Sequence, residues 1–385
     1  MELIDNYVYC LPVSFQSDMF PFSHVIRLLR RASVSLPRPS STPRFSSSGF
    51  ATLAAVGDHM RAGMGLPATS SLFSLPPSFA LENGQTPANT ILGYNTYGRL
   101  ARDGRNAVLV GHSLTSNSCV HEWWANLMGP GPSFFLDTNR YYVVCVNLLG
   151  SVYGSTGPAS LGVGNVALGA SGFPIATIRD NVRAQRCLLD ALGVRSLAIA
   201  TGGSLGGMLA VEFALTYPGY VDSLALVAAC AAHPPWAVAL GAAGRAAIFA
   251  DAAWEGGDYR VKGLRQPTRG LDAARQLAML TYKSPKSVGL KFGRGTVSSS
   301  APPSMRGGAG NATAPFFAVE SYLEHQGDKF TARFDAAAYV RLTQLLDSHD
   351  VANGREGGVE LVLKACTAER SLVVGIDSDV LYPVR

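Results

Sequence analysis

The 385-residue sequence has no run of 18 uninterrupted apolar residues, although 47% of its residues are hydrophobic. It therefore lacks the signature of a membrane-spanning helix, which needs about 20 consecutive apolar residues. Charged residues make up only 15% of the chain, and the net charge is +5. Lysine and arginine form no cluster interleaved with aromatic residues, so we expect no nucleic-acid partner.

The cysteines are few and scattered, and no two of them have the CxxC spacing of a redox or zinc motif. Several fall in apolar stretches, which is typical of buried free thiols in a reducing compartment. Histidines and cysteines also lack the spacing of metal ligands, so we expect no bound metal. The six cysteines are Cys10, Cys119, Cys145, Cys187, Cys230 and Cys366.

Acidic residues are absent between Asp18 and Asp58, whereas five arginines and a dense run of serine and proline occupy that stretch. Low acidity with abundant arginine and serine is typical of an organellar transit peptide. We therefore interpret residues 1–75 as a disordered leader and expect a mitochondrial or other organellar location. The alternatives are a leader without targeting function, a misassigned gene start, and a cytoplasmic location.

The stretch around Ser204 has the pattern of a nucleophile elbow. An apolar run at 197–200 predicts a buried strand, and a helical pattern follows at 208–215. Between them, Gly202 and Gly206 flank the serine as Gly-x-Ser-x-Gly. Small neighbours allow the serine a strained turn, and the helix N-terminus behind it faces any oxyanion that forms there. A glycine-rich turn with an uninvolved serine is the alternative.

Short apolar runs alternate with helical patterns through the first part of the chain. A helix begins at Thr177, which forms a predicted capping box with Asp180, and Gly193 closes it. This alternation predicts an α/β fold with a doubly wound, mostly parallel sheet, in which residues 90–97 form an edge strand. The apolar runs lie at 106–110, 141–146, 197–200, 223–229 and 371–375.

The alternation stops between residues 234 and 350, where the sequence is mostly helical. We predict that this insertion covers the carboxyl edge of the sheet as a lid, with a Gly/Ser/Pro-rich surface loop at 294–313. The core is then residues 76–233 and an incomplete second part at 351–385. The predicted lid helices are residues 237–250, 271–280, 318–324 and 334–346.

A serine nucleophile needs a base, and in this fold an acid and then a histidine follow it in the chain. Asp379 lies just past the last predicted strand, and Asp377 competes with it as the acid. No histidine follows Asp379, so we expect the chain to be truncated at its carboxyl end. The histidines are His24, His59, His112, His121, His233, His325 and His349, and none has the expected position.

Two further sets of residues are candidates for the site. The N–H of Leu205 is predicted to form an oxyanion hole with an N–H of the loop at 112–114, unless that loop is an ordinary polar turn. Arg275 and Tyr282 are seven residues apart in a helical pattern and therefore share one face. A guanidinium binds a carboxylate bidentately, so this pair could hold a substrate. An exposed arginine beside a packed tyrosine is the alternative.

From residue 79 to residue 383 the sequence resembles the homoserine O-acetyltransferases of the α/β-hydrolase superfamily. The matching motifs are residues 97–100 (YGRL), 112–115 (HSLT), 120–124 (VHEWW), 154–158 (GSTGP), 177–180 (TIRD), 202–208 (GGSLGGM), 274–276 (ARQ), 281–284 (TYKS), 347–350 (DSHD) and 378–383 (SDVLYP). The resemblance implies an α/β-hydrolase fold with a helical lid. It also implies that Ser204 carries an acetyl group, that Asp379 is the triad acid, and that Leu114 and Leu205 supply the oxyanion-hole donors.

The resemblance further implies that Arg275 and Tyr282 bind substrate. Members move acetyl from acetyl-CoA to L-homoserine in two half-reactions, a step of methionine biosynthesis, with acetyl-CoA as co-substrate and no bound cofactor. We expect small-molecule substrates, a homodimer and no membrane partner. The alternatives are L-serine as acceptor in cysteine biosynthesis, a plain serine hydrolase, and an inactive truncated chain. The family's oxyanion loop has Ala and Gly where this sequence has Ser113 and Ser116.

Overall fold

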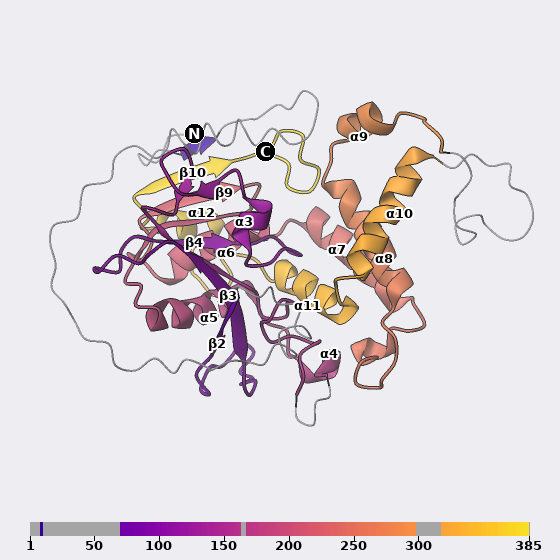
Figure 1. Cartoon of the computed structure of the whole chain (residues 1–385), viewed down its shortest axis with the longest axis horizontal. Helices are drawn as coiled ribbons and strands as arrows, with labels where there is room; N and C mark the ends of the chain where they lie inside the picture. The colour runs from indigo at the N-terminus through magenta and orange to yellow at the C-terminus, as the bar shows by residue number, and fades with distance from the viewer. Residues whose placement is uncertain (1–7, 11–69, 163–166, 298–316, 385) are drawn as a thin grey trace, which may run out of the picture.

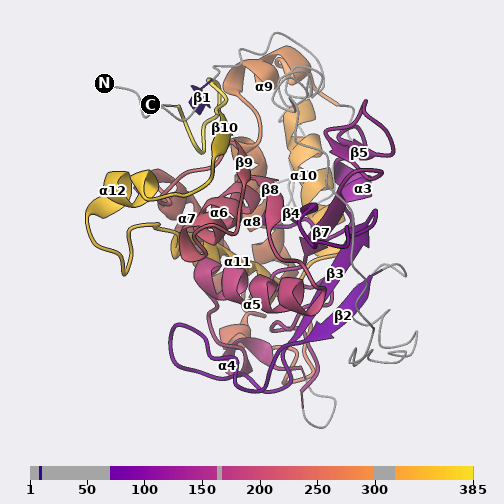
Figure 2. The ribbon, with the colours of Figure 1, turned by 90° about the vertical axis from the view of Figure 1, so that its left-hand side faces the viewer.

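The computed structural model describes residues 8–10, 70–162, 167–297 and 317–384. Its central sheet is formed by β1 (Val8–Cys10), β2 (Ser71–Ser74), β3 (Ile91–Tyr97), β4 (Ala107–Gly111), β7 (Tyr142–Val146), β8 (Leu197–Gly203), β9 (Ser223–Val227) and β10 (Arg370–Val374). The strands lie in the order β1-β10-β9-β8-β4-β7-β3-β2 (Figure 1 and Figure 2). Only the β2–β3 and β3–β7 pairs are antiparallel among these strands, which confirms the predicted, mostly parallel α/β sheet.

Both faces of the sheet are covered, because alternate residues of a strand point to opposite sides. In β4, Leu109 joins the larger core beneath α5 (Ile178–Ala191) and α6 (Leu205–Thr216). Its neighbours Val108 and Val110 belong to a second core on the opposite face. Figure 2 shows α5 and α6 lying against the strands. Two-sided burial explains why the central strands read as continuous apolar runs.

The helix α5 begins and ends as predicted. The Thr177 hydroxyl accepts the Asp180 N–H at 3.0 Å, and the Asp180 carboxylate accepts the Thr177 N–H at 3.0 Å. This reciprocal pair satisfies two donors that a helix start otherwise leaves unpaired. Gly193 follows the helix with a φ of 81°, the left-handed conformation that ends many helices.

The lid contains α7 (Pro235–Phe249), α8 (Thr268–Thr281), α9 (Pro285–Phe292), α10 (Ala318–Thr331) and α11 (Ala336–Asp347). Helix α8 packs between α7 and α10, and these helices gather on one side of the sheet (Figure 1). Four of the five were predicted from the sequence, although the helix predicted at 318–324 continues to Thr331 as α10. The smaller elements are α3 (Val120–Trp123), β5 (Met128–Gly129), β6 (Leu136–Asp137), α4 (Gly169–Gly172), a 3-10 turn η2 (Glu255–Gly257) and α12 (Gly358–Lys364).

Two expectations were wrong at the edges of the sheet. The strand predicted at 90–97 is not an edge strand, because β2 pairs with it through four antiparallel residue pairs. The leader predicted at 1–75 contains β2, and it also contains β1, which pairs in parallel with β10. Backbone pairing with an existing strand places these short segments, which have only three and four residues. Residues 11–69 of the leader and 298–313 of the predicted loop lie outside the described residues.

Within the described ranges, no helix combines the length and apolar character needed to cross a membrane. The same ranges hold no group of three or more His, Cys, Asp or Glu side chains that could bind a metal ion. Free thiols are found at Cys119, Cys145, Cys187, Cys230 and Cys366, and Cys119 and Cys145 are buried.

Candidate active site

Ser204 occupies a strained turn between β8 and α6. Its φ of 55° and ψ of −124° lie in a region that residues with a side chain rarely adopt, at a cost on the order of 1–3 kcal/mol. The Ser204 N–H donates to the Val227 carbonyl on β9 at 2.9 Å, which holds the turn against the sheet. The residue is only half-buried, so its hydroxyl remains accessible. This is the geometry of the predicted nucleophile elbow.

The glycines beside Ser204 are required by close backbone contacts. A Cβ on Gly206 would lie 2.0 Å from the Gly111 carbonyl oxygen, and one on Gly202 would lie 2.4 Å from the Gly206 carbonyl carbon. A Cβ on Gly203 would meet only the Val227 oxygen at 3.8 Å, an ordinary contact. The elbow therefore needs glycine at 202 and 206 but not at 203.

The contact between Gly111 and Gly206 places the loop that follows β4 against the first turn of α6. Leu205 opens that helix, and the N–H groups of a first turn have no partner inside a helix. In the loop, which carries Leu114, the Ser113 and Ser116 hydroxyls hydrogen-bond to each other at 2.9 Å. The two serines that depart from the family pattern thus close the loop on itself. The structure brings the two predicted oxyanion segments together.

His112, at the start of this loop, has a structural role. Its Nδ1 lies 2.8 Å from the Ser113 carbonyl oxygen, and the ring is 1% exposed. Burial lowers the pKa of His112 to about 4, so the ring is neutral at physiological pH. With the proton on Nδ1, the ring shapes the loop as a hydrogen-bond donor.

Asp379 fixes a tight turn just after β10. Its Oδ1 accepts the N–H groups of Leu381 and Tyr382 at 2.8 and 2.9 Å, and the side chain is half-buried. Asp377 is exposed instead. The Trp236 indole N–H donates to the Val380 carbonyl at 2.8 Å, which ties the turn to the start of α7.

This turn places Tyr382 beside Ser204. The Tyr382 ring is 8% exposed, and burial raises the pKa of its hydroxyl, which therefore stays protonated. The neighbouring Ser204 hydroxyl opposes that rise, which shows that the two side chains are close. The sequence analysis did not select Tyr382, although it lies in the SDVLYP motif three residues after Asp379.

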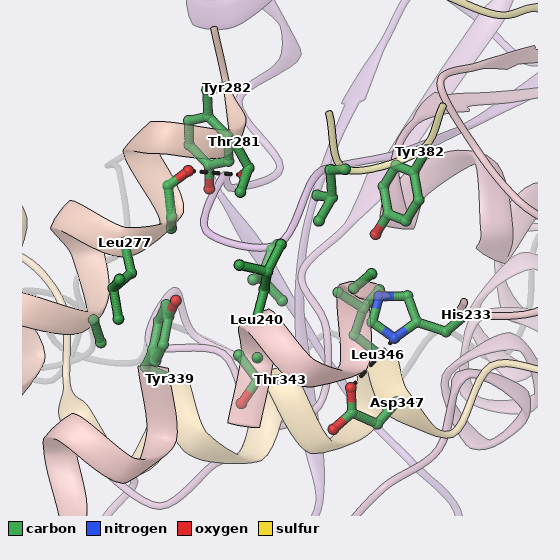
Figure 3. Close-up of a pocket in the computed structure, with 16 residues that line it drawn as sticks. His233, Leu240, Leu277, Thr281, Tyr282, Tyr339, Thr343, Leu346, Asp347 and Tyr382 are labelled. Atoms are coloured by element: carbon green, nitrogen blue, oxygen red, sulfur yellow. Dashed lines mark hydrogen bonds and ion pairs between the residues drawn. The ribbon is translucent and has the colours of Figure 1, made fainter. Parts of the chain in front are cut away.

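A cavity with a volume of about 70 Å³ lies under the lid next to these residues. Helices α7, α8 and α11 supply most of its wall, which is largely apolar. Leu114 of the oxyanion loop and Tyr382 also line it, so the cavity adjoins Ser204. Its polar lining residues include His233, Thr281, Tyr282, Tyr339, Thr343, Asp347 and Tyr382 (Figure 3).

Arg275 and Tyr282 lie together as predicted. An Arg275 guanidinium nitrogen lies 3.4 Å from the Tyr282 hydroxyl oxygen, and the guanidinium also lies over the Phe330 ring, 4.8 Å from its centre. Tyr282 faces the cavity, and its side chain is 41% exposed. The Arg275 Nε is buried without a hydrogen-bond partner. Tyr282 thus lines the cavity, and Arg275 contacts it without lining the cavity itself.

The sequence analysis also missed His233, which lines the cavity with its side chain 2% exposed. Its Nδ1 lies 3.3 Å from Asp347 Oδ1, and Arg245 binds the other oxygen of that carboxylate at 2.7 Å. These residues come from the loop after β9, from α7 and from the end of α11. No local pattern indicates such a group, because Asp347 lies more than 100 residues from His233 and Arg245 in the sequence.

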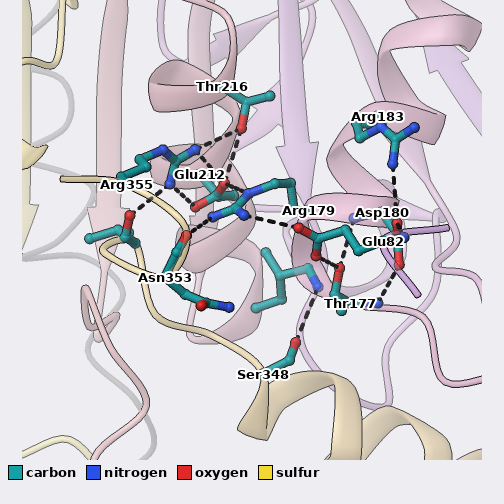
Figure 4. Close-up of polar contacts among 12 residues, drawn as sticks. Glu82, Thr177, Arg179, Asp180, Arg183, Glu212, Thr216, Ser348, Asn353 and Arg355 are labelled. Atoms are coloured by element: carbon teal, nitrogen blue, oxygen red, sulfur yellow. Dashed lines mark hydrogen bonds and ion pairs between the residues drawn. The ribbon is translucent and has the colours of Figure 1, made fainter. Parts of the chain in front are cut away.

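A second charged cluster lies farther along α6, around Glu212 (Figure 4). Arg179 and Arg355 bind the buried carboxylate at 2.7 and 2.6 Å, and Arg179 also pairs with Glu82. Burial alone would raise the pKa of Glu212, but hydrogen bonds and charge from Arg355 and Arg179 outweigh it and lower the pKa. The cluster ties α5 and the segment after α11 to the helix that carries Ser204.

Comparisons with known proteins agree with this geometry. Residues 106–383 match the family model of the alpha/beta hydrolase fold. The homoserine O-acetyltransferase of Salinibacter ruber is 45% identical over 312 residues, which cover 80% of this chain and 84% of the relative.

Solved structures give the same result. The homoserine O-acetyltransferase from Bacillus anthracis superposes with a TM-score of 0.71 at 26% identity, over 82% of this chain and 85% of that one. Esterase E22 superposes with a TM-score of 0.69 at 25% identity, over 82% of this chain and 86% of the esterase.

Proposed function

The chain belongs to the α/β-hydrolase family and, within it, to the homoserine O-acetyltransferases, a family of acyltransferases, and from this premise we propose its reaction. It moves an acetyl group from acetyl-CoA to the side-chain hydroxyl of L-homoserine, a step of methionine biosynthesis. Acetyl-CoA is a co-substrate, and no cofactor is required. The observation that carries the proposal is the strained, half-buried Ser204 beside a cavity under a helical lid.

In the first half-reaction, the Ser204 oxygen attacks the thioester carbonyl of acetyl-CoA. The Ser204 Oγ–carbon bond forms, the carbon–sulfur bond breaks, and the serine proton leaves with the CoA thiol. The N–H groups of Leu114 and Leu205 stabilise the oxyanion, each by about 3 kcal/mol in the transition state. The result is an acetyl ester on Ser204 and free CoA.

In the second half-reaction, the hydroxyl of the amino acid attacks the acetyl ester, and its proton passes to Ser204 as the ester bond breaks. Arg275 binds the carboxylate of the acceptor, and the Tyr282 hydroxyl contacts its polar groups. Asp379 is the acid of the triad and keeps its turn in place through the N–H groups of Leu381 and Tyr382.

The test measures CoA release from acetyl-CoA with L-homoserine, with L-serine, and without an acceptor. We expect L-homoserine to give the highest kcat/KM and O-acetylhomoserine as the product. A single methylene separates the two acceptors, which is worth about 1–3 kcal/mol in a fitted pocket. A higher kcat/KM for L-serine would assign the enzyme to cysteine biosynthesis instead.

A plain hydrolase is the second candidate, because an esterase superposes nearly as well as an acetyltransferase. Transfer requires that water is kept from the acetyl ester, and the lid over the cavity favours this. The partition of acetate between water and acceptor distinguishes the two functions. Acetate release at the same rate with and without L-homoserine would favour the hydrolase.

A further inference from the structure

Unpaired polar atoms gather around one side of the cavity. Ten buried side-chain nitrogen or oxygen atoms in the described part of the chain have no hydrogen-bond partner. Half of them belong to His233, Arg245, Asp347 and Tyr382. Buried polar groups are normally paired, so unpaired ones concentrated beside a candidate nucleophile call for a functional explanation.

These four side chains follow one another in a line that leads to Ser204. Arg245 binds one oxygen of Asp347 at 2.7 Å, and the other oxygen lies 3.3 Å from Nδ1 of His233. The rings of His233 and Tyr382 are 6.0 Å apart between centres. Figure 3 shows the second ring nitrogen of His233 on the side that faces the Tyr382 hydroxyl.

We propose that Arg245, Asp347 and His233 form a positioning chain that orients the Tyr382 hydroxyl, and through it the hydroxyl of Ser204. The inference rests on the proposed role of Ser204 as nucleophile. It concerns residues to which neither the family resemblance nor the comparisons assign a function.

The direction of the hydrogen bonds follows from the two ends of this positioning chain, Asp347 and Ser204. Asp347 is a carboxylate paired with Arg245, and a carboxylate only accepts hydrogen bonds, so Nδ1 of His233 carries the proton and donates to it. Nε2 of His233 is then an acceptor, and the protonated Tyr382 hydroxyl donates to it. The Tyr382 oxygen is left to accept a hydrogen bond from the Ser204 hydroxyl. The lone pairs of Ser204 Oγ then point away from Tyr382, toward the acyl group.

The surroundings suit a positioning role, because two members lie on lid helices and backbone hydrogen bonds hold the segments of the other two. Arg245 lies on α7 and Asp347 at the end of α11. The backbone N–H of His233 donates to the backbone carbonyl of His349 at 2.7 Å, which ties the loop after β9 to the segment after α11. Apo hydrogen bonds in catalytic sites are often long, so the 3.3 Å contact is expected to shorten when the cavity is filled.

The experiment measures the rate at which a fluorophosphonate probe labels Ser204 in the full chain. We expect Y382F and H233L each to slow labelling on the order of tenfold, as the loss of one coupled hydrogen bond would. H233Q keeps a hydrogen-bond donor and an acceptor at this position, so we expect it to retain most of the wild-type labelling rate that H233L loses. The double variant Y382F/H233L reacts no more slowly than either single variant, because both break the same chain.

Controls separate positioning from simple folding. H349Q alters a buried histidine whose Nε2 donates to the Cys230 carbonyl, and it leaves the labelling rate unchanged. Thermal unfolding of every variant checks that it is folded. With acetyl-CoA as substrate, Y382F and H233L lower kcat and leave KM unchanged, because the chain aligns the nucleophile and does not bind the donor.

The inference is overturned if H233L and Y382F react like the wild type, if their effects multiply in the double variant, or if Ser204 of the wild type is not labelled. The probe contains neither CoA nor an amino acid. Labelling that follows the expected pattern without acetyl transfer would therefore reject the proposed function and keep the positioning chain. Acetyl transfer with normal labelling in all variants would reject only the positioning chain.

Discussion

Glu212 and Asp347 are two carboxylates with similar neighbours and different states of pairing. Arg179 and Arg355 bind both oxygens of Glu212, and the Thr216 hydroxyl donates to it as well. Asp347 has one oxygen bound to Arg245 and the other unpaired beside His233. Both oxygens of Glu212 therefore have hydrogen-bond partners, whereas one oxygen of Asp347 can still accept a hydrogen bond.

This difference distinguishes a cluster that stabilises the fold from one that can still bind a ligand or a reacting group. A buried carboxylate with all its partners in place stabilises the fold through the penalty that any loss would incur. A cluster with unpaired atoms at a cavity costs stability until a ligand or a reacting group completes it. Helix α6 links the two regions, because Ser204 precedes its first turn and Glu212 lies two turns later.

The largest expected effect is on catalytic activity, and it distinguishes Ser204, just before α6, from Glu212, farther along that helix. S204A removes the nucleophile, so we expect acetyl transfer to fall to the uncatalysed background while the fold persists. E212Q changes the structural cluster and leaves kcat unchanged in the folded fraction. Steady-state CoA release, corrected for the folded fraction, checks both. A large loss of kcat in E212Q would contradict the division of roles.

For the free energy of unfolding we expect the larger effect at Glu212 and the smaller one at Asp347. E212A leaves Arg179 and Arg355 facing each other without their carboxylate, and we expect it to lower the free energy of unfolding by about 3–5 kcal/mol. D347A removes a partly exposed carboxylate whose pairing is incomplete, and we expect a loss of about 2 kcal/mol. Urea denaturation measures both values. An equal or larger loss in D347A would mean that its cluster is structural too.

A matched pair of glycine substitutions tests the close backbone contact between the start of α6 and Gly111. A Cβ on Gly206 meets backbone that cannot move aside, so we expect G206A to destabilise the protein by about 3 kcal/mol and to abolish labelling of Ser204. G203A makes only an ordinary contact and is expected to change stability by less than about 0.5 kcal/mol. Unfolding curves of the two variants, which differ by three positions in the chain, would be indistinguishable if backbone contact did not determine the elbow.

The pH dependence of stability sharpens the account of Glu212. Its pKa in the folded state is below its ordinary value of 4.5, so its contribution is complete above that pH and is lost as the pH falls through the lowered value. E212Q cannot ionise. We therefore expect the gap in melting temperature between the wild type and E212Q to be constant near neutral pH and to shrink below pH 4.5. A gap that does not shrink in acid would show that the ionised carboxylate is not the stabilising form.

The smallest effect measures backbone strain at Ser204. S204A and S204G both remove the hydroxyl, but only glycine adopts a φ of 55° and a ψ of −124° without strain. We expect S204G to be more stable than S204A by about 1 kcal/mol. Equal melting temperatures would mean that the elbow stores no strain.

Local patterns predicted much of this structure. The capping box at Thr177 and the strand–glycine–helix pattern around Ser204 each involve a few neighbouring residues, so the sequence alone shows them. Most lid helices were found because their apolar periodicity is long. Helix α9 (Pro285–Phe292) was missed because it is short, and α12 (Gly358–Lys364) follows a left-handed glycine and has only seven residues.

Contacts between distant segments were beyond a single sequence. β2 has four residues and is a strand because it pairs with β3. His233 and Asp347 meet because two loops and two lid helices converge under the sheet edge, and nothing near His233 in the chain indicates that convergence. Tyr382 was hidden for the same reason, since its position beside Ser204 depends on the turn that Asp379 holds.

The most direct test of the account is to mix the full chain with acetyl-CoA, quench it in acid, and map acetylated peptides by mass spectrometry. The account predicts one acetyl group on the peptide that contains Ser204, which disappears when L-homoserine is added and is absent from S204A. Acetyl attached at undiminished yield in S204A, or found on another residue of the wild type, would contradict it.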